Sequence, residues 1–284
     1  MEWLTDPWTS TLMRRAFIEA LVIGALSGAI GCFVLVRGLA FLGESVAHAL
    51  VLGVVVAFLL GLSPALGAAM GAAATVLLAT SVAQDERLSF DTAMGVILPS
   101  FFGLGVLLIA LGEGFRTRLE EVLFGSILSV TTLDLALGAG AAVLAAAVLL
   151  LAGKELALVA FDRQVAQAMG YRVALLDLLL LAVVTIAVVA ALRGTGNVLL
   201  TGLLLGPAAT ARLVCRTFGS MAIAAAILGA AAGVAGLYAT WHLEVGGGPA
   251  IVLVVTAMFA VTLAWTRLPL PFARSRTPAG ATPR

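Results

Sequence analysis

The stretch LAFLGESVAHALVLGVVVAFLL, residues 39–60, decides the fold class of this chain. Apart from Glu44 and His48 it contains no ionisable side chain. It is longer than the roughly 18 apolar residues that indicate a membrane-spanning helix. The stretch therefore predicts a transmembrane helix that carries two ionisable side chains.

The whole chain has the composition of a polytopic membrane protein. Hydrophobic residues make up 62% of it and charged residues only 11%, with a mean hydropathy of +1.16, whereas soluble proteins are about one quarter charged. We expect an all-α membrane bundle of about nine transmembrane helices, at residues 16–36, 39–60, 64–83, 91–111, 132–153, 173–192, 197–214, 218–240 and 249–266. The segment 197–214 is short and contains Asn197 and Pro207, so we expect it to be broken or partly re-entrant.

Small residues and charges predict how this bundle is packed and oriented. Glycine pairs four residues apart allow close helix contacts in lipid, and they occur at Gly24/Gly28, Gly67/Gly71, Gly202/Gly206 and Gly229/Gly233. With the N-terminus outside, eleven of the sixteen Lys and Arg residues face the cytoplasm, as the positive-inside rule requires. We expect an extracytoplasmic segment at 1–15 without a signal peptide, a transmembrane domain at 16–266 and a disordered cytoplasmic tail at 267–284.

Glu44 and His48 are the candidate functional side chains. Residues four apart lie on one helix face with Cβ atoms roughly 5–6 Å apart. Ionisable groups within a membrane usually face a bundle interior or a water-filled path, so this pair predicts a transport path. The alternative is a buried ion pair that fixes helix packing. Asp134 and Asp177 lie near span ends and are interpreted as caps or interfacial residues.

The longest polar interruption between spans, residues 154–172, predicts a docking helix. Asp162 can cap a short helix over 163–169, and Gly170 can end it. Val165, Ala166 and Met169 form a small apolar stripe on this helix. Such a stripe suits a groove on a soluble partner, and an ordinary interfacial helix is the alternative.

The chain has no nucleotide-binding motif. Gly153-Lys154 lacks the upstream glycine of a phosphate-binding loop. If ATP drives transport, a separate subunit must hydrolyse it, and the chain itself is not an enzyme. No nucleic-acid partner is expected. His242 and Glu244 are expected in an outer loop, as a solvated pair.

Several stretches, in order along the chain, resemble the membrane subunit of bacterial ABC importers for zinc, manganese and ferrous iron, the ABC-3 permease family. They are Met13–Ala16, Val36–Glu44 with Ala47–Ala49, Leu123–Leu128, Phe161–Gly170 and Pro207–Leu213. The family usually has Asp at the position of Glu44 and Pro at the position of Leu52.

The resemblance implies a fold like that of type II ABC importers in the bacterial cytoplasmic membrane. It implies a homodimer of permeases that pairs with two ATPase subunits and receives metal from an extracytoplasmic binding protein. Glu44 and His48 would be ligands on the metal path. The coupling helix that contacts the ATPase would contain Phe161, Asp162, Arg163, Val165, Ala166, Met169 and Gly170.

One Glu and one His are too few to hold a divalent ion, because zinc prefers four N, O or S ligands. Two copies of the chain would supply Glu2His2 for a transported zinc, manganese or iron ion, with no permanently bound cofactor. Binding needs a neutral His48, so uptake should fall as acid protonates the imidazole. Two other functions stay open: a permease for a metal chelate of the siderophore or vitamin B12 type, and a non-transporting membrane scaffold.

Overall fold

The computed structural model describes residues 2–82, 89–111 and 131–267, and within them all regular structure is α-helical. The helices are α1 (Glu2–Thr9), α2 (Thr11–Val36), α3 (Ala40–Leu59), α4 (Pro64–Val82), α5 (Phe90–Leu111), α7 (Thr132–Phe161), α8 (Arg163–Ala168), α9 (Val173–Val214), α10 (Phe218–Leu243) and α11 (Gly247–Arg267). The predicted motif Leu123–Leu128 and residues 268–284 of the predicted tail lie outside the described residues.

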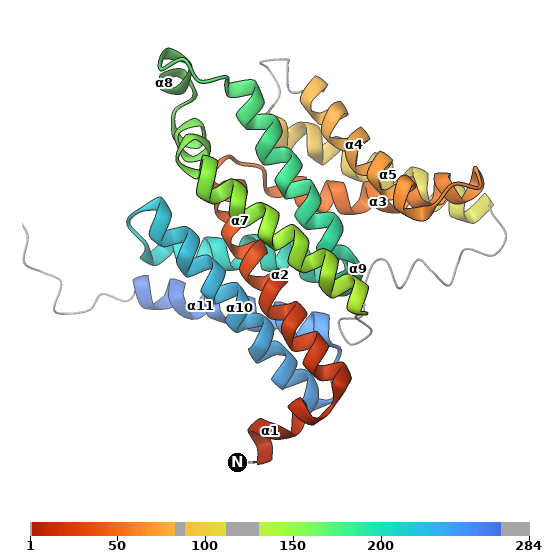
Figure 1. Cartoon of the computed structure of the whole chain (residues 1–284), viewed down its shortest axis with the longest axis vertical. Helices are drawn as coiled ribbons and strands as arrows, with labels where there is room; N and C mark the ends of the chain where they lie inside the picture. Colours follow the sequence, from red (N-terminus) through yellow and green to blue (C-terminus); the bar gives the residue numbers. More distant parts are fainter. Residues whose placement is uncertain (1, 83–88, 112–130, 268–284) are drawn as a thin grey trace, which may run out of the picture.

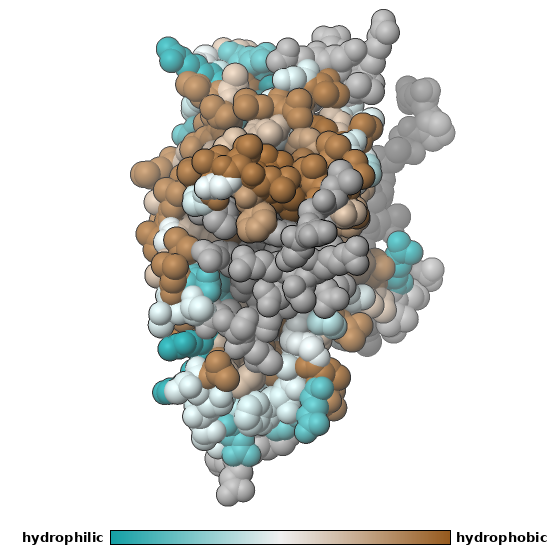
Figure 2. Space-filling view, turned by 90° about the vertical axis from the view of Figure 1, so that its right-hand side faces the viewer, coloured by the Kyte–Doolittle hydropathy of each residue, from teal (hydrophilic) through white to brown (hydrophobic). Residues whose placement is uncertain are grey.

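The apolar segments confirm the predicted transmembrane bundle. Seven helices of the described part are long and apolar enough to cross a membrane, and two shorter apolar segments, Leu66–Val82 and Leu199–Val214, bring the set to the nine expected. Figure 2 shows a broad band of apolar side chains across the upper part of one face, with hydrophilic side chains above it and toward the lower end. A surface of this kind is matched to a bilayer.

The predicted interruption at 193–196 is wrong, because α9 is helical from Val173 to Val214 with Pro207 inside it. A helix of this length spans about 63 Å at about 1.5 Å per residue, roughly twice the hydrocarbon thickness. Figure 1 shows how α9 is accommodated: its green half and its teal half run in different directions. The segment 197–214 is therefore the second half of a bent helix.

Three helix ends also differ from the predicted spans. Helix α2 begins at Thr11, before the predicted start at 16, and α7 continues past 153 to Phe161. Helix α10 runs to Leu243, so His242 lies in a last helical turn and not in a loop. At the start of α7, Asp134 forms a reciprocal capping box with Thr131, which confirms its predicted role as a cap.

Helix α2 is central in one part of the bundle, where it packs against α7, α9 and α10 (Figure 1). Helix α3 packs against α4 and α5 in a second part, on the right of Figure 1, and also contacts α9. The turn between α2 and α3 joins the two parts. Any displacement at the end of α2 therefore acts directly on the start of α3.

Glycine allows the backbones of α2 and α10 to touch. A Cβ atom added at Gly24 would lie 2.5 Å from the carbonyl oxygen of Gly229, and one added at Gly28 would lie 2.2 Å from that of Ala225. Helices α3 and α4 meet in the same way, since a Cβ at Gly53 would lie 2.0 Å from the oxygen of Gly67. The glycine pairs therefore act as predicted, as close helix contacts.

Glu19 is a buried carboxyl group that the sequence analysis did not single out. It is fully buried on α2, and neither of its oxygen atoms has a hydrogen-bond partner among the described residues. Gly138 of α7 faces it, because a Cβ there would lie 3.3 Å from Oε2 of Glu19. A buried polar group without a hydrogen bond is destabilising, so Glu19 weakens the contact between α2 and α7.

We predict that Gly28→Ala lowers the thermal denaturation midpoint in detergent, because the added methyl group meets the backbone of α10. Overpacking of this kind costs about 1–3 kcal/mol. Gly140→Ala is the matched control, since a Cβ at Gly140 has nothing within 4 Å and alanine favours the helix by up to about 1 kcal/mol. Equal midpoints for the two variants would contradict the contact.

Replacing Glu19 with methionine is expected to raise the denaturation midpoint. The change removes two buried oxygen atoms whose missing hydrogen bonds cost about 1–3 kcal/mol each, and methionine has a similar length. Glu19→Gln keeps polar atoms in the same place and should give no such gain. A lower midpoint for Glu19→Met than for the wild type would show that the carboxyl group stabilises the protein.

Candidate functional site

Glu44 and His48 lie on successive turns of α3, at the edge of its buried face. Both side chains are half-buried. Leu42 and Val46 of the same helix are fully buried, whereas Phe41 is 46% exposed. The pair therefore lies on the boundary between the core of this chain and its outer surface, where another molecule can reach it.

The ring of His48 is held in one orientation. Its Nδ1 lies 2.9 Å from the backbone oxygen of Glu44. A carbonyl oxygen only accepts hydrogen bonds, so Nδ1 carries the proton and the lone pair of the neutral ring lies on Nε2. Phe102 of α5 packs edge-on against the ring, with 5.1 Å between centroids. Histidines that bind metals usually donate the N–H of one ring nitrogen to such an acceptor and bind the metal through the other nitrogen.

The first turns of α3 are fixed by polar contacts to α5. The backbone N–H of Phe41 donates to Oδ1 of Asp91 at 3.4 Å, and the Ser45 hydroxyl donates to the backbone oxygen of Met94 at 3.3 Å. Asp91, which belongs to α5, thus accepts a hydrogen bond from a backbone N–H in the first turn of α3, as an N-cap side chain of α3 itself would do. Sequence reasoning missed this role, because an acid at the start of a span is interpreted as a cap of its own helix.

A single chain does not provide a complete metal site in its described part. No group of three or more His, Cys, Asp or Glu side chains lies close enough there to hold a metal ion. Glu44 and His48 supply two side-chain ligands at most. Transition metals in proteins usually have four or more ligands, so the pair by itself is too small to hold such an ion.

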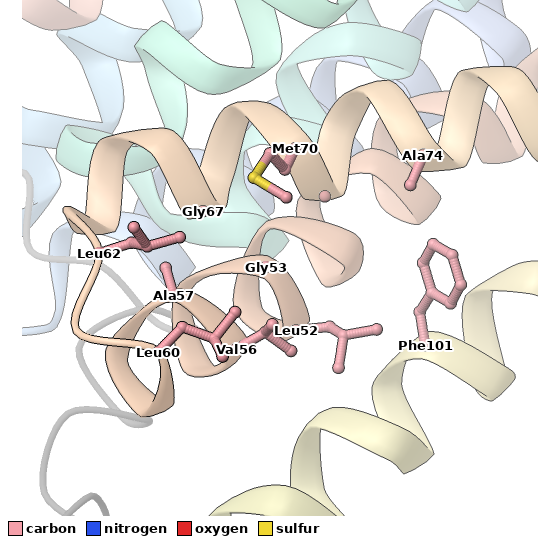
Figure 3. Close-up of a pocket in the computed structure, with 11 residues that line it drawn as sticks. Leu52, Gly53, Val56, Ala57, Leu60, Leu62, Gly67, Met70, Ala74 and Phe101 are labelled. Atoms are coloured by element: carbon pink, nitrogen blue, oxygen red, sulfur yellow. The ribbon is translucent and has the colours of Figure 1, made fainter.

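An apolar pocket adjoins the C-terminal half of α3. It has a volume of about 190 Å³ and extends from Leu52, one turn beyond His48, to Leu62 and Met70 of the α4 side and Phe101 of α5. Figure 3 shows that the labelled residues come from α3, α4, α5 and the turn between α3 and α4, and none of their side chains carries a charge or a nitrogen or oxygen atom. This pocket cannot ligate a metal ion.

The predicted short helix after the fifth long helix is confirmed as α8, Arg163–Ala168. The carboxylate of Asp162 accepts a hydrogen bond from the backbone N–H of Val165 at 2.9 Å, and Gly170 follows with a positive φ of 85°. Val165 and Met169 are exposed. Ala166 is fully buried against Val159 and Val173, so the exposed stripe is smaller than predicted.

Phe161 connects the segment before α8 to the bundle core. Its ring is 65% exposed and packs edge-on against Phe218, with 5.9 Å between centroids. Phe218 in turn packs against Phe33 of α2 at 4.6 Å. The segment before α8 therefore has both an exposed ring face and an apolar contact that leads to α2.

Asp177 of α9 joins α8 to the end of α2. Its Oδ1 lies 2.5 Å from Nη1 of Arg37, and its Oδ2 lies 2.7 Å from Nη2 of Arg163. The interpretation of Asp177 as a possible cap is therefore wrong, since both oxygens bind arginines of other segments. We call Arg37, Asp177 and Arg163 the Asp177 cluster.

Aromatic residues pack α1 against the end of α10. The indole N–H of Trp8 donates to the Tyr238 hydroxyl at 2.8 Å, and the Trp8 ring stacks on Phe17. His242 stacks near Tyr238, with 6.4 Å between ring centroids. This end of the bundle contains the residues predicted outside, and the Asp177 cluster lies among residues predicted in the cytoplasm.

Comparison with known proteins identifies a family and several relatives that this chain resembles. The model of the ABC 3 transport family matches residues 9–266. The manganese import system permease protein ScaB of Streptococcus gordonii is 35% identical over 250 residues, 88% of this chain and 90% of the relative. The chelated iron transport system membrane protein YfeD of Yersinia pestis is 27% identical, over 93% of this chain and 89% of the relative.

A solved structure is similar to the chain in both fold and sequence. The structure of PsaBC from Streptococcus pneumoniae in complex with Fab aligns with a TM-score of 0.81 and 31% identity. The alignment covers 92% of this chain and 94% of the other. With its apolar helices, the chain is a multi-pass protein of the cytoplasmic membrane, and it belongs to the ABC 3 transport family.

Proposed function

We propose that this chain is the membrane-spanning permease of an ATP-driven importer for a divalent transition-metal ion, with manganese as the first candidate. The observation that carries the proposal is the His48 ring, whose Nδ1–H bonds to the backbone oxygen of Glu44 and so leaves the lone pair on Nε2. A carboxylate lies one turn away on the same helix. Imidazole with carboxylate is a ligand set that suits manganese, iron and zinc.

Relatives support manganese ahead of the other two ions. ScaB is named as a manganese import permease, and so are further relatives of similar identity. YfeD is named for chelated iron. Zinc stays within the proposed range because its preferred N and O ligands are the same.

The site is completed by a second copy of the chain. Glu44 and His48 lie at the outer edge of α3, so a two-fold axis along this edge would bring two carboxylates and two imidazoles together. Such a site would have only four side-chain ligands, contributed by two chains. Separation of the two α3 helices would therefore weaken binding and release the ion, which a transporter requires.

The coupling role of α8 follows from its exposed residues and its rigid start. Phe161, Val165 and Met169 present apolar surface, and Arg163 is also exposed. We place an ATPase subunit against this surface, in the cytoplasm. The N-terminus then lies outside and the C-terminus inside, and an extracytoplasmic metal-binding protein delivers the ion on the side of α1.

A metal chelate is the second candidate substrate, because YfeD is named for chelated iron and the pocket beside Leu52 is lined only by apolar side chains. A chelate brings its own ligands for the metal. It would therefore be carried without help from Glu44 and His48, and this difference separates the two candidates.

We predict that His48→Gln and Glu44→Gln each lower manganese uptake at least about tenfold in proteoliposomes that contain the permease and its ATPase and are supplied with the metal-binding protein. Loss of even a second-shell partner of a metal ligand typically costs ten- to hundredfold. Glu44→Asp keeps a carboxylate and should retain measurable uptake. The measurement is time-resolved uptake of radioactive manganese.

His242→Gln is the control for this experiment, because His242 is the other histidine of the chain and lies on α10. Its uptake should stay within about twofold of the wild type. Wild-type uptake in assembled complexes of both His48→Gln and Glu44→Gln would contradict the ligand role. Retained transport of an iron chelate in these variants would favour the second candidate.

For α8 we predict that Asp162→Ala speeds backbone amide exchange in residues 163–168 about fivefold. The change removes an N-cap, which is worth about 1 kcal/mol. Asp162→Asn retains an acceptor oxygen and should exchange like the wild type. Hydrogen-exchange mass spectrometry of the permease in detergent measures both variants. Unchanged exchange in Asp162→Ala would show that α8 does not depend on this cap.

A further inference from the structure

We propose that Asp177 is a positioning residue that ties α8 to the start of α3, so that a movement of α8 reaches Glu44 and His48. The inference rests on the proposed function, in which α8 meets the ATPase and α3 carries the metal ligands. Asp177 itself touches neither of these ligands in the contacts described above. Its role would be mechanical, through the two arginines of the Asp177 cluster.

The two ion pairs of Asp177 differ in burial. The side chain of Arg37 is 10% exposed, that of Asp177 19% and that of Arg163 60%. Charge pairs are screened by water in proportion to their exposure. The pair Arg37–Asp177 is therefore the less screened of the two, and Arg163–Asp177 is the more screened one.

Arg37 is coupled to α3 through a short and well-defined turn. It is the C-cap of α2, and Gly38 follows with a φ of 66°. The N–H of Leu39 bonds back to the oxygen of Val34 at 2.9 Å, which closes a Schellman-type turn. Helix α3 begins at the next residue, and Glu44 lies in its second turn. A force on Arg37 thus acts on the metal-bearing helix without a flexible linker.

Arg163 is coupled to α8 as firmly as Arg37 is to α3, because Arg163 is the first residue of α8. The cap by Asp162 fixes the start of the helix, and the buried Ala166 fixes its middle. Among the described residues, this segment also makes apolar contacts, through Ala166 and the Phe161–Phe218 ring pair. Apolar contacts are not directional, whereas an ion pair fixes two groups in one register. Arg163–Asp177 therefore sets the position of α8 along α9.

The test is Arg163→Ala in the reconstituted complex of permease and ATPase. Arg163 is exposed and its loss leaves Asp177 paired with Arg37, so the fold is kept. Arg172→Ala is the matched control. It removes the same charge close to α8, and Arg172 forms no ion pair with the described part of the chain. Three quantities are measured: the amount of ATPase bound, the basal rate of ATP hydrolysis and the manganese ions moved per ATP.

We expect the manganese ions moved per ATP hydrolysed to fall at least about fivefold in Arg163→Ala, with both quantities normalised to the amount of ATPase bound. This is the lower end of the range typical of coupling between sites. Arg163→Lys keeps a cation near Asp177 and should restore most of the coupling. An unchanged ratio of ions to ATP in Arg163→Ala would overturn the proposal.

A double-mutant cycle separates this role from a direct contact between Arg163 and the ATPase. If Arg163 acts through Asp177, then Arg163→Ala changes nothing further once Asp177→Asn is present. An equal effect in both backgrounds, or loss of ATPase binding by Arg163→Ala alone, would overturn the proposal in favour of a direct contact. Should Asp177→Asn fail to fold, the single variants and the Arg163→Lys rescue still decide.

The outcome is independent of which side chains bind the metal. The ratio of ions to ATP is defined for any transported ion, so it is measurable even if Glu44 and His48 prove not to be ligands. Loss of coupling in Arg163→Ala together with wild-type uptake in His48→Gln would support the Asp177 cluster and reject the proposed metal site. Wild-type coupling in Arg163→Ala together with lost uptake in His48→Gln would reject the role of the Asp177 cluster and leave the proposed metal site standing.

Discussion

Direct backbone contact between glycine-bearing helix faces is the constraint on which this bundle depends. Lipid offers little hydrophobic drive for helices to associate, so stability comes from close packing and a few polar contacts. At Gly24 and Gly28 of α2 no side chain fits against α10, and Gly53 of α3 meets α4 in the same way. These contacts fix α2 and α3, the helices on either side of the turn that joins the two parts of the bundle.

Much of the fold was predictable from the sequence, because membrane helices are recognised by local apolar runs. The limits of the helices were less predictable. Helix α7 continues to Phe161 because a helix can extend past the hydrocarbon core into polar surroundings, where hydropathy no longer marks it. Residues 193–196 combine Arg and Gly and so resemble a loop, but the helical hydrogen bonding of α9 continues through them. Local sequence does not distinguish a bend from a break.

The candidate site likewise has features that local sequence predicts and features that it does not. The spacing of Glu44 and His48 is local, and the sequence therefore predicted that they share a helix face. The hydrogen bond that fixes the His48 tautomer is also within α3, but its geometry needs coordinates. Asp91 and Asp177 act on other helices, and Asp177 pairs with Arg37 across 140 residues of sequence. No local pattern in a single sequence reports such tertiary contacts.

The positions of the two functional regions explain how a weak site can be controlled. The proposed half-site at the edge of α3 would respond to any change in the distance between two copies of the chain, because each copy would supply only part of the ligand set. The start of α3 is held from two sides, by Asp91 of α5 and, through the α2–α3 turn, by the Asp177 cluster. Of these two contacts, only the one through the Asp177 cluster connects to α8. A movement of α8 would therefore turn or shift α3 about its contact with α5, and a small displacement at one end would change the ligand geometry one turn away.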